Sequence, residues 1–323
     1  RKINHDPSGI MHFHSNQGEN SIKSDEVLSF LEDNFGNFLV GLGGVGLYQF
    51  QGRPNSFQEY TINHKLVGKS VKTIYKDNGG TLWLGSWEGG LTKYNAANKQ
   101  LEIFHPSVGN FPSQHVWAIE GSVSENIWVG TLRDGLYLFS PASKKFQLFN
   151  HNDKDSSSLI NNDVLSLLLD SKGNLWIGTG NGLSIRLSGA TGFENYFRMG
   201  SGLMKNLTSN VIRCIYEDGS NRLWLGTNGS GLIIVELKGK NLEVTKILSV
   251  SNGLASNVIS ALQPDGRGNV WVSTNDGLSI VDSKSIAMKE IGNNQSLKGV
   301  EFLANSSLLT SSGRLLFGSS SGF

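Results

Sequence analysis

The sequence predicts an all-β fold, a seven-bladed β-propeller of four-stranded antiparallel blades, and three observations support this prediction. Glycine accounts for 40 of the 323 residues, whereas the chain has only 6 prolines. Short apolar runs of alternating polarity are separated by Gly, Asn and Asp, which is typical of strands joined by tight turns. One motif recurs along almost the whole chain at the length of a propeller blade.

The recurring motif is an apolar–Trp–apolar–Gly–Thr segment, followed a few residues later by Gly-Leu. Its copies contain Trp83, Trp128, Trp176, Trp224 and Trp271, with weaker copies starting at Phe38 and Leu315. The glycine position falls at 41, 85, 130, 178, 226, 273 (a serine there) and 318, so the intervals lie between 44 and 48 residues. Chance does not hold such a register over seven units.

Each repeat contains four extended segments, which we interpret as strands. The first is apolar and ends at an Asp turn, the second carries the repeat Trp, the third follows Gly-Leu, and the fourth is aromatic and half polar. One domain spanning 1–323 is expected, with blades at about 27–62, 71–105, 116–150, 164–198, 211–248, 258–291 and 300–323. Because an open ring leaves bare sheet edges, we expect segment 10–13 to close it as the outer strand of the last blade.

Composition and motifs exclude several classes of function. The formal net charge is +1, from 28 basic and 27 acidic residues, which argues against nucleic-acid binding by bulk charge. No apolar run is long enough to span a membrane. Cys214 is the single cysteine, so an internal disulfide and a cysteine zinc cage are excluded. His12 and His14 lack a third metal ligand, and no catalytic or phosphate-binding motif is present, so we expect no catalytic residues, metal or cofactor.

The candidate ligand site consists of residues that lie on the expected ligand-binding face and differ from one repeat to the next. They lie in the loops between second and third strands, just before the first strand of blade three, and at the second position of the first strand. An aromatic face can stack on a sugar ring while charged and amide groups bind its hydroxyls. The candidate ligand-binding residues are Trp87, Glu88, Arg133, Asp134, His115, Trp117, Lys72 and Arg213.

The repeat V-x-x-[IL]-x-x-D-x-x-G-x-L-W-[LIV]-G-T-x-x-G-L resembles that of the two-component regulator propeller family. The loop Asn252–Val258 is similar to that family's lead-in, and Glu301–Gly318 is similar to its variant final blade. The resemblance implies the periplasmic sensor region of a hybrid two-component histidine kinase/response regulator, here the second of two propellers. It further implies a neighbouring propeller and a β-sandwich as partners, leaves a homodimer open, and suggests polysaccharide sensing. The absence of an initial Met or signal peptide indicates an excised fragment.

Three functions remain open from the sequence. The leading hypothesis is a non-enzymatic sensor propeller that binds an oligosaccharide or a partner domain and relays that event as a conformational or oligomeric shift. One alternative is an interaction scaffold whose ligand site lies on a neighbouring domain. The other is a glycan-acting propeller enzyme with Glu88 and Asp134 as acid and base, which would need a defined separation of the two carboxylates.

Overall fold

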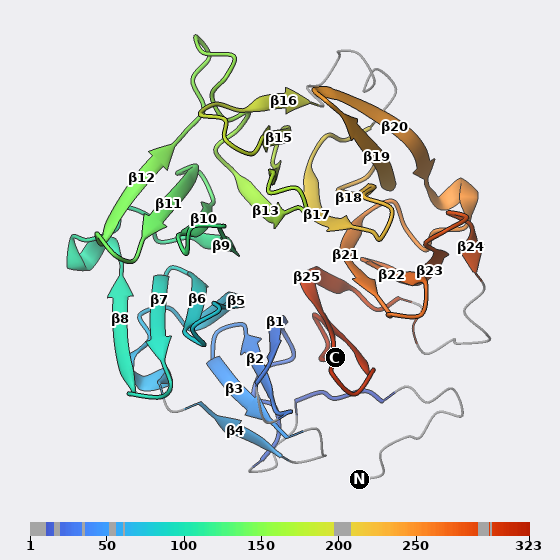
Figure 1. The fold of residues 1–323 in the computed structure, drawn as a ribbon. Helices are drawn as coiled ribbons and strands as arrows, with labels where there is room; N and C mark the ends of the chain where they lie inside the picture. The colour runs from blue at the N-terminus through green and yellow to red at the C-terminus, as the bar shows by residue number, and fades with distance from the viewer. Residues whose placement is uncertain are drawn as a thin grey trace.

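The computed structural model describes residues 11–15, 20–33, 36–51, 56–60, 62–196, 208–289, 297 and 299–323. These residues form an all-β ring of sheets arranged around a common centre (Figure 1). Six sheets have four antiparallel strands that are paired in chain order, and one further sheet has two strands. In each four-stranded sheet the first strand lies innermost and the fourth outermost (Figure 1).

The strands of the six four-stranded blades follow one another along the chain. Blades one to three comprise β1 (Val27–Glu32), β2 (Phe38–Leu42), β3 (Gly46–Phe50), β4 (Phe57–Glu59); β5 (Ser70–Lys76), β6 (Leu82–Trp87), β7 (Gly90–Asn95), β8 (Gln100–Phe104); and β9 (Val116–Gly121), β10 (Ile127–Thr131), β11 (Leu136–Ser140), β12 (Lys145–Phe149). Blades four to six comprise β13 (Val164–Leu169), β14 (Leu175–Thr179), β15 (Gly182–Arg186), β16 (Glu194–Tyr196); β17 (Ile212–Glu217), β18 (Leu223–Thr227), β19 (Leu232–Lys238), β20 (Asn241–Leu248); and β21 (Ile259–Pro264), β22 (Asn269–Thr274), β23 (Gly277–Asp282), β24 (Met288–Lys289).

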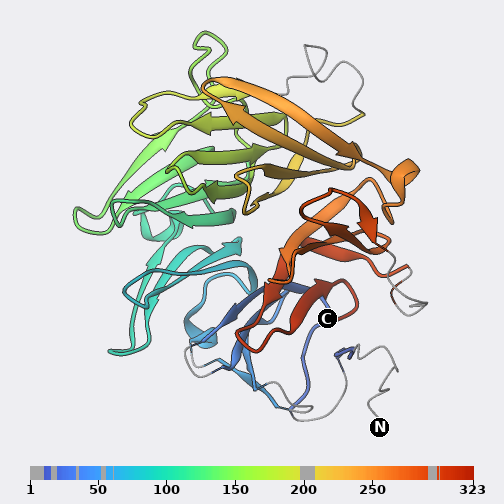
Figure 2. The ribbon, with the colours of Figure 1, turned by 45° about the vertical axis from the view of Figure 1, so that its right-hand side comes forward.

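The prediction of seven four-stranded blades is wrong, because the structure has six. The last repeat forms a two-stranded sheet, β25 (Phe302–Leu309) and β26 (Leu315–Ser319). This sheet lies between blades six and one, where β25 packs against both β21 and β1 (Figures 1 and 2).

The predicted closure by an N-terminal strand is also wrong for the residues that the structure describes. Residues 11–15 form no strand, and Ile10 lies outside the described residues. Phe13 nevertheless exchanges two backbone hydrogen bonds with Phe323, at N···O distances of 2.7 and 2.9 Å. Two isolated bonds fix this segment beside the chain end without extending the sheet.

Three of the five repeated Trp residues join the core to the turn between the first two strands. Trp176 is fully buried, and its indole N–H donates to Oδ2 of Asp170 at 2.8 Å. Oδ1 of the same carboxylate accepts the backbone N–H of Asn174 at 2.7 Å. Trp83 and Trp224 make the equivalent bonds to Asp77 and Asp218. The Asp of the repeat therefore does more than form a turn, because it also satisfies the buried indole.

The glycine of the repeat is required by contact between neighbouring blades. A Cβ placed on Gly41 would lie 2.4 Å from the carbonyl oxygen of Val71 in the next blade. A Cβ on Gly318 in β26 would lie 2.3 Å from the carbonyl oxygen of Val27 in β1. Since such distances are too short for any side chain, this glycine sets how closely the innermost strands pack around the ring.

Candidate functional site

A β-bulge near the start of each innermost strand, at its second residue or in β5 its third, shapes the centre of the six four-stranded blades. In β5, Val71 pairs with Ser86 and Thr73 with Gly85, so Lys72 is left without a partner. The bulged residues of the six blades are Leu28, Lys72, Trp117, Leu165, Arg213 and Ser260. A bulge re-aims the side chain of its extra residue. This geometry explains why these positions vary between otherwise similar strands.

Four of the predicted residues come together on blades two and three, and we call Trp87, His115, Trp117 and Lys72 the mouth cluster. Trp87 ends β6 and is 40% exposed. The centre of its indole lies 4.4 Å from the His115 ring and 5.9 Å from that of Trp117, which it meets edge-on. The Nδ1 atom of His115 faces the backbone N–H of Glu88 at 3.4 Å.

Lys72 forms the inner end of the mouth cluster. Its Nζ lies 4.8 Å from the centre of the Trp117 ring and donates to the carbonyl oxygen of Ala304 at 2.9 Å. Burial of this side chain, together with repulsion from Arg213, lowers the pKa of Lys72 to about 8, although Glu26 acts in the opposite direction. A cavity of about 180 Å³ lies beside it and is also lined by Trp117 and Asn305.

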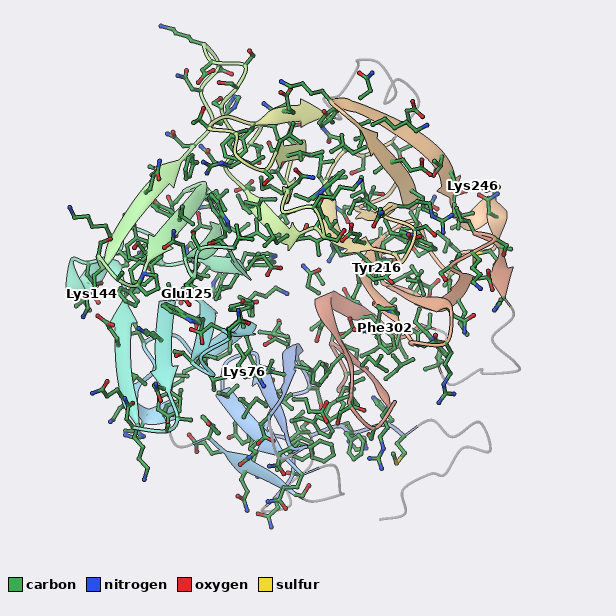
Figure 3. All side chains as sticks on the ribbon, in the orientation of Figure 1. Lys76, Glu125, Lys144, Tyr216, Lys246 and Phe302 are labelled. Carbon is green, nitrogen blue, oxygen red and sulfur yellow. The ribbon has the colours of Figure 1, made fainter. Side chains whose placement is uncertain are left out.

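Asn305 connects this cavity to blades four and five. The pairing of β25 with β26 is interrupted between Phe302 and Ser307, and Asn305 in this interruption has a φ of +57°. Its Nδ2 donates to the carbonyl oxygens of Leu165 at 3.2 Å and Arg213 at 2.9 Å. Residues far apart in the ring are thus linked through one irregular strand, which the regular part of the repeat did not predict. Figure 3 shows Phe302 and Tyr216 nearer the centre of the ring than Lys144 or Lys246.

The remaining predicted residues lie outside the mouth cluster. Glu88 and Arg133 occupy loop positions with φ of +60° and +76°, and both side chains are exposed. The backbone N–H of Arg133 donates to Oδ1 of Asp163 at 2.8 Å. Asp134 is exposed, and Nη1 of Arg213 donates to Oδ1 of Asn228 at 3.3 Å. No hydrogen bond or ring contact of the described residues joins these side chains to Trp87.

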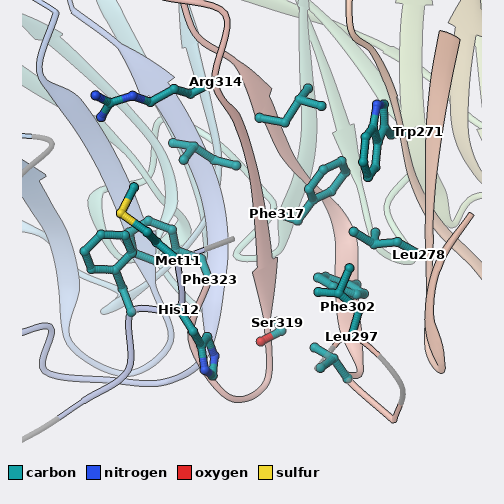
Figure 4. Close-up of a pocket in the computed structure, with 14 residues that line it drawn as sticks. Met11, His12, Trp271, Leu278, Leu297, Phe302, Arg314, Phe317, Ser319 and Phe323 are labelled. Carbon is teal, nitrogen blue, oxygen red and sulfur yellow. The ribbon is translucent and has the colours of Figure 1, made fainter. Parts of the chain in front are cut away.

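A larger cavity of about 370 Å³ lies beside the two-stranded sheet (Figure 4). Apolar side chains dominate its lining, among them Trp271, Phe302 and Phe317. It lies between blade six, which contributes Trp271 and Leu278, and the two-stranded sheet. Its walls offer few groups for directional binding, so we do not assign the ligand site to it.

The described residues include no group of three His, Cys, Asp or Glu side chains placed to hold a metal ion. The rings of His12 and His14 lie 5.8 Å apart. In the same part of the chain, no helix has the length and apolar character needed to cross a membrane.

Three stretches of the chain, residues 158–181, 206–229 and 253–276, match the family described as "Two component regulator propeller". The predicted resemblance is therefore confirmed. A comparison with curated proteins gave no match.

Solved structures of similar fold include two extracellular domains from B. thetaiotaomicron proteins designated as hybrid two component systems. The first is 26% identical with a TM-score of 0.77 and covers 97% of this chain and 41% of its own. The second is 19% identical with a TM-score of 0.73, covering 96% and 38%. PorZ, a surface component of the type-IX secretion system of Porphyromonas gingivalis, is 21% identical with a TM-score of 0.60, covering 84% and 39%.

The latter two likenesses establish the fold alone, and this chain spans less than half the length of each of the three proteins. Together with the family repeats, the first shows a propeller similar to the extracellular domains of two-component systems and not a catalytic domain. The prediction that this fragment is not an enzyme agrees with that similarity.

Proposed function

We propose that this chain is the periplasmic sensor propeller of a hybrid two-component receptor, and that an oligosaccharide or a partner domain binds at the mouth cluster. The fold, the family repeats and the likeness to an extracellular sensor domain support a sensor. The observation that carries the choice of site is the exposed Trp87 held against His115 and Trp117.

Repeat packing does not require an indole at residue 87. The equivalent residues of the next four blades are Leu132, Gly180, Asn228 and Asn275. Trp is among the residues most enriched at interfaces and at binding hot spots. The edge-on contact with Trp117 and the tilted contact with His115 hold the indole, so it offers a stacking plane at little cost in side-chain freedom.

The bonds beneath the mouth cluster offer a route for relaying a binding event. Lys72 bonds to Ala304, and the next residue, Asn305, bonds to blades four and five. A ligand shifts an arrangement only if it binds one form better than another. A ligand that moves Trp117 or Lys72 would change the bonds made by β25, and with them the packing of blades across the ring.

The test measures binding of an oligosaccharide panel by calorimetry, together with signalling by the full receptor in cells. Replacing both Trp87 and Arg133 with Ala should weaken binding and signalling by at least about tenfold, about 1.4 kcal/mol, with folding intact. Val123→Ala is the matched control, because Val123 is 85% exposed and lies outside the mouth cluster. Parental binding by the well-folded double variant would place the ligand site elsewhere and favour the scaffold hypothesis.

A further inference from the structure

Lys72 and Arg213 are cations at bulged positions on blades two and five. Within the described residues, no carboxylate oxygen lies within 4.0 Å of either one. Lys72 is only 7% exposed, and a buried charge without a partner of opposite sign is costly. The centre of the ring therefore holds positive charge that the fold does not neutralise by a direct ion pair.

Nearby carboxylates compensate for this charge only from a distance. Burial lowers the pKa of Arg213, while Cys214 and Glu301 oppose that change. Glu26 and Glu301 are the carboxylates that act on Lys72 and Arg213, and both are exposed, so solvent and salt screen them. An anion held directly against Lys72 would be favoured by both cations at once.

The space beside Lys72 suits a small oxyanion. A protonated Lys has three donors, and the carbonyl of Ala304 is the one hydrogen-bond acceptor that the described residues give it. The cavity of about 180 Å³ next to it is lined by Trp117, Asn305 and Ser29 among others. Trp117 contacts both Lys72 and Trp87, so a group on Lys72 and a ring on Trp87 would be neighbours in one ligand.

We propose that the mouth cluster selects an acidic saccharide, whose carboxylate or sulfate group enters the cavity beside Lys72 while its ring stacks on Trp87. This inference rests on the proposed function, because it names the ligand class of the same site. A neutral saccharide would stack equally well on Trp87 but would leave the ammonium without its oxyanion. Selectivity should therefore come from Lys72 and affinity from both residues.

The test is a glycan array that pairs each acidic oligosaccharide with a neutral counterpart. Uronic-acid chains stand beside their methyl esters, and sulfated chains beside their desulfated forms. We expect retention of acidic members with at least about a tenfold loss on neutralisation, and the retained arm identifies carboxylate or sulfate. Retention should fall as the pH rises through about 8, where Lys72 loses its proton.

Two variants separate Lys72 from general charge effects. Lys72→Met should abolish the acidic preference and its pH dependence. Lys172→Met removes the same charge from an exposed position in the turn between β13 and β14, and should leave both unchanged. Equal retention of acidic and neutral glycans, unaffected by Lys72→Met, would overturn the acidic ligand while leaving the proposed function in place.

If the array retains no glycan, a titration with sodium sulfate tests the cavity alone. Sulfate should change the tryptophan fluorescence of the parent protein and leave that of Lys72→Met unaltered, because Trp117 lies against Lys72. A sulfate response without any retained glycan would overturn the saccharide function and keep the anion site. The absence of a sulfate response would overturn the anion site itself.

Discussion

The Trp–Asp pairs of the blades and the mouth cluster use similar residues to opposite effect. Trp176 is fully buried and bonded to Asp170, and the same arrangement recurs at Trp83 and Trp224. Trp87 is 40% exposed and has no equivalent in other blades. Repetition in a propeller therefore marks residues that hold the blades together, and departures from it mark residues that the fold does not need.

The energetic difference follows from the surroundings of each group. A buried indole with a satisfied N–H adds apolar burial without an unpaired polar group. By contrast, Lys72 and Glu120 on the innermost strands are ionisable groups whose burial opposes their charged forms. The repeated residues thus raise the free energy of unfolding, whereas the buried ionisable groups that do not repeat lower it. Functional sites often lower stability in this way.

The largest expected effect comes from the repeated core. Trp176→Ala should lower the free energy of unfolding by about 3–5 kcal/mol, because it removes a fully buried large aromatic side chain and leaves the Asp170 carboxylate without its indole donor. Denaturant unfolding of variant and parent measures this difference. Equal midpoints would show that the repeated Trp does not stabilise the blade.

The next largest effect should come from replacing Glu120 in β9, and this change should stabilise the protein at high pH instead of destabilising it. Burial raises the pKa of Glu120 from 4.5 to about 7, although backbone bonds from Gly121 and Leu169 oppose this change. Because the pKa of Glu120 is higher in the folded protein, its contribution to the free energy of unfolding is fully present below about pH 4.5. That contribution is lost as the pH rises through about 7. This loss is at most about 3 kcal/mol.

Glu120→Gln removes this titration and is the direct check on it. The variant should match the parent in thermal unfolding at pH 4 and exceed it at pH 8. A parent whose stability relative to the variant stays constant between pH 4 and pH 8 would contradict the raised pKa of the half-buried Glu120.

Lys72→Met should be more stable than the parent at pH 7 by about 1 kcal/mol, because an apolar side chain of similar length replaces a buried cation. The folded pKa of Lys72 is lowered from 10.5 to about 8, so the parent should gain stability as the pH rises from about 8 to 10.5. The difference between the two proteins should therefore shrink over that range. Urea unfolding at pH 7 and pH 9.5 measures it, and a less stable variant at both values would mean that Lys72 supports the fold.

The smallest expected effect on stability belongs to Trp87→Ala. An exposed loop-end side chain outside the core usually changes the free energy of unfolding by less than about 0.5 kcal/mol. The melting temperatures of this variant, of Val123→Ala and of the parent should therefore agree closely. A large loss in Trp87→Ala alone would assign Trp87 to the structural class of Trp176.

The sequence predicted the features that the repeat encodes. Trp83, Trp176 and Trp224 lie in the core, and the bulged residues near the start of the innermost strands lie towards the centre. Variation at that position also pointed to Lys72 and Trp117, which the structure brings together with Trp87 and His115.

Features that depend on long-range packing could not be predicted in the same way. The last repeat has the same motif as the full blades but forms only two strands. The motif covers the second strand and the start of the third, so it does not fix how many strands a repeat forms. The prediction of seven four-stranded blades is therefore wrong. The hydrogen bonds from Asn305 to blades four and five depend on an interruption in the pairing of β25 with β26. Loop order groups Arg133 with Trp87, but loop order does not fix where a long exposed side chain lies.

The most direct test of the central claim, that a ligand meets the molecule at the mouth cluster, is hydrogen exchange of the parent protein with and without a glycan retained by the array. We expect added protection at residues 86–89, 115–118 and 303–306, because these backbone segments carry or adjoin Trp87, Trp117 and the Lys72 acceptor Ala304. Protection confined to the opposite ends of the blades, around the turns that follow Asp77 and Asp170, would contradict the account.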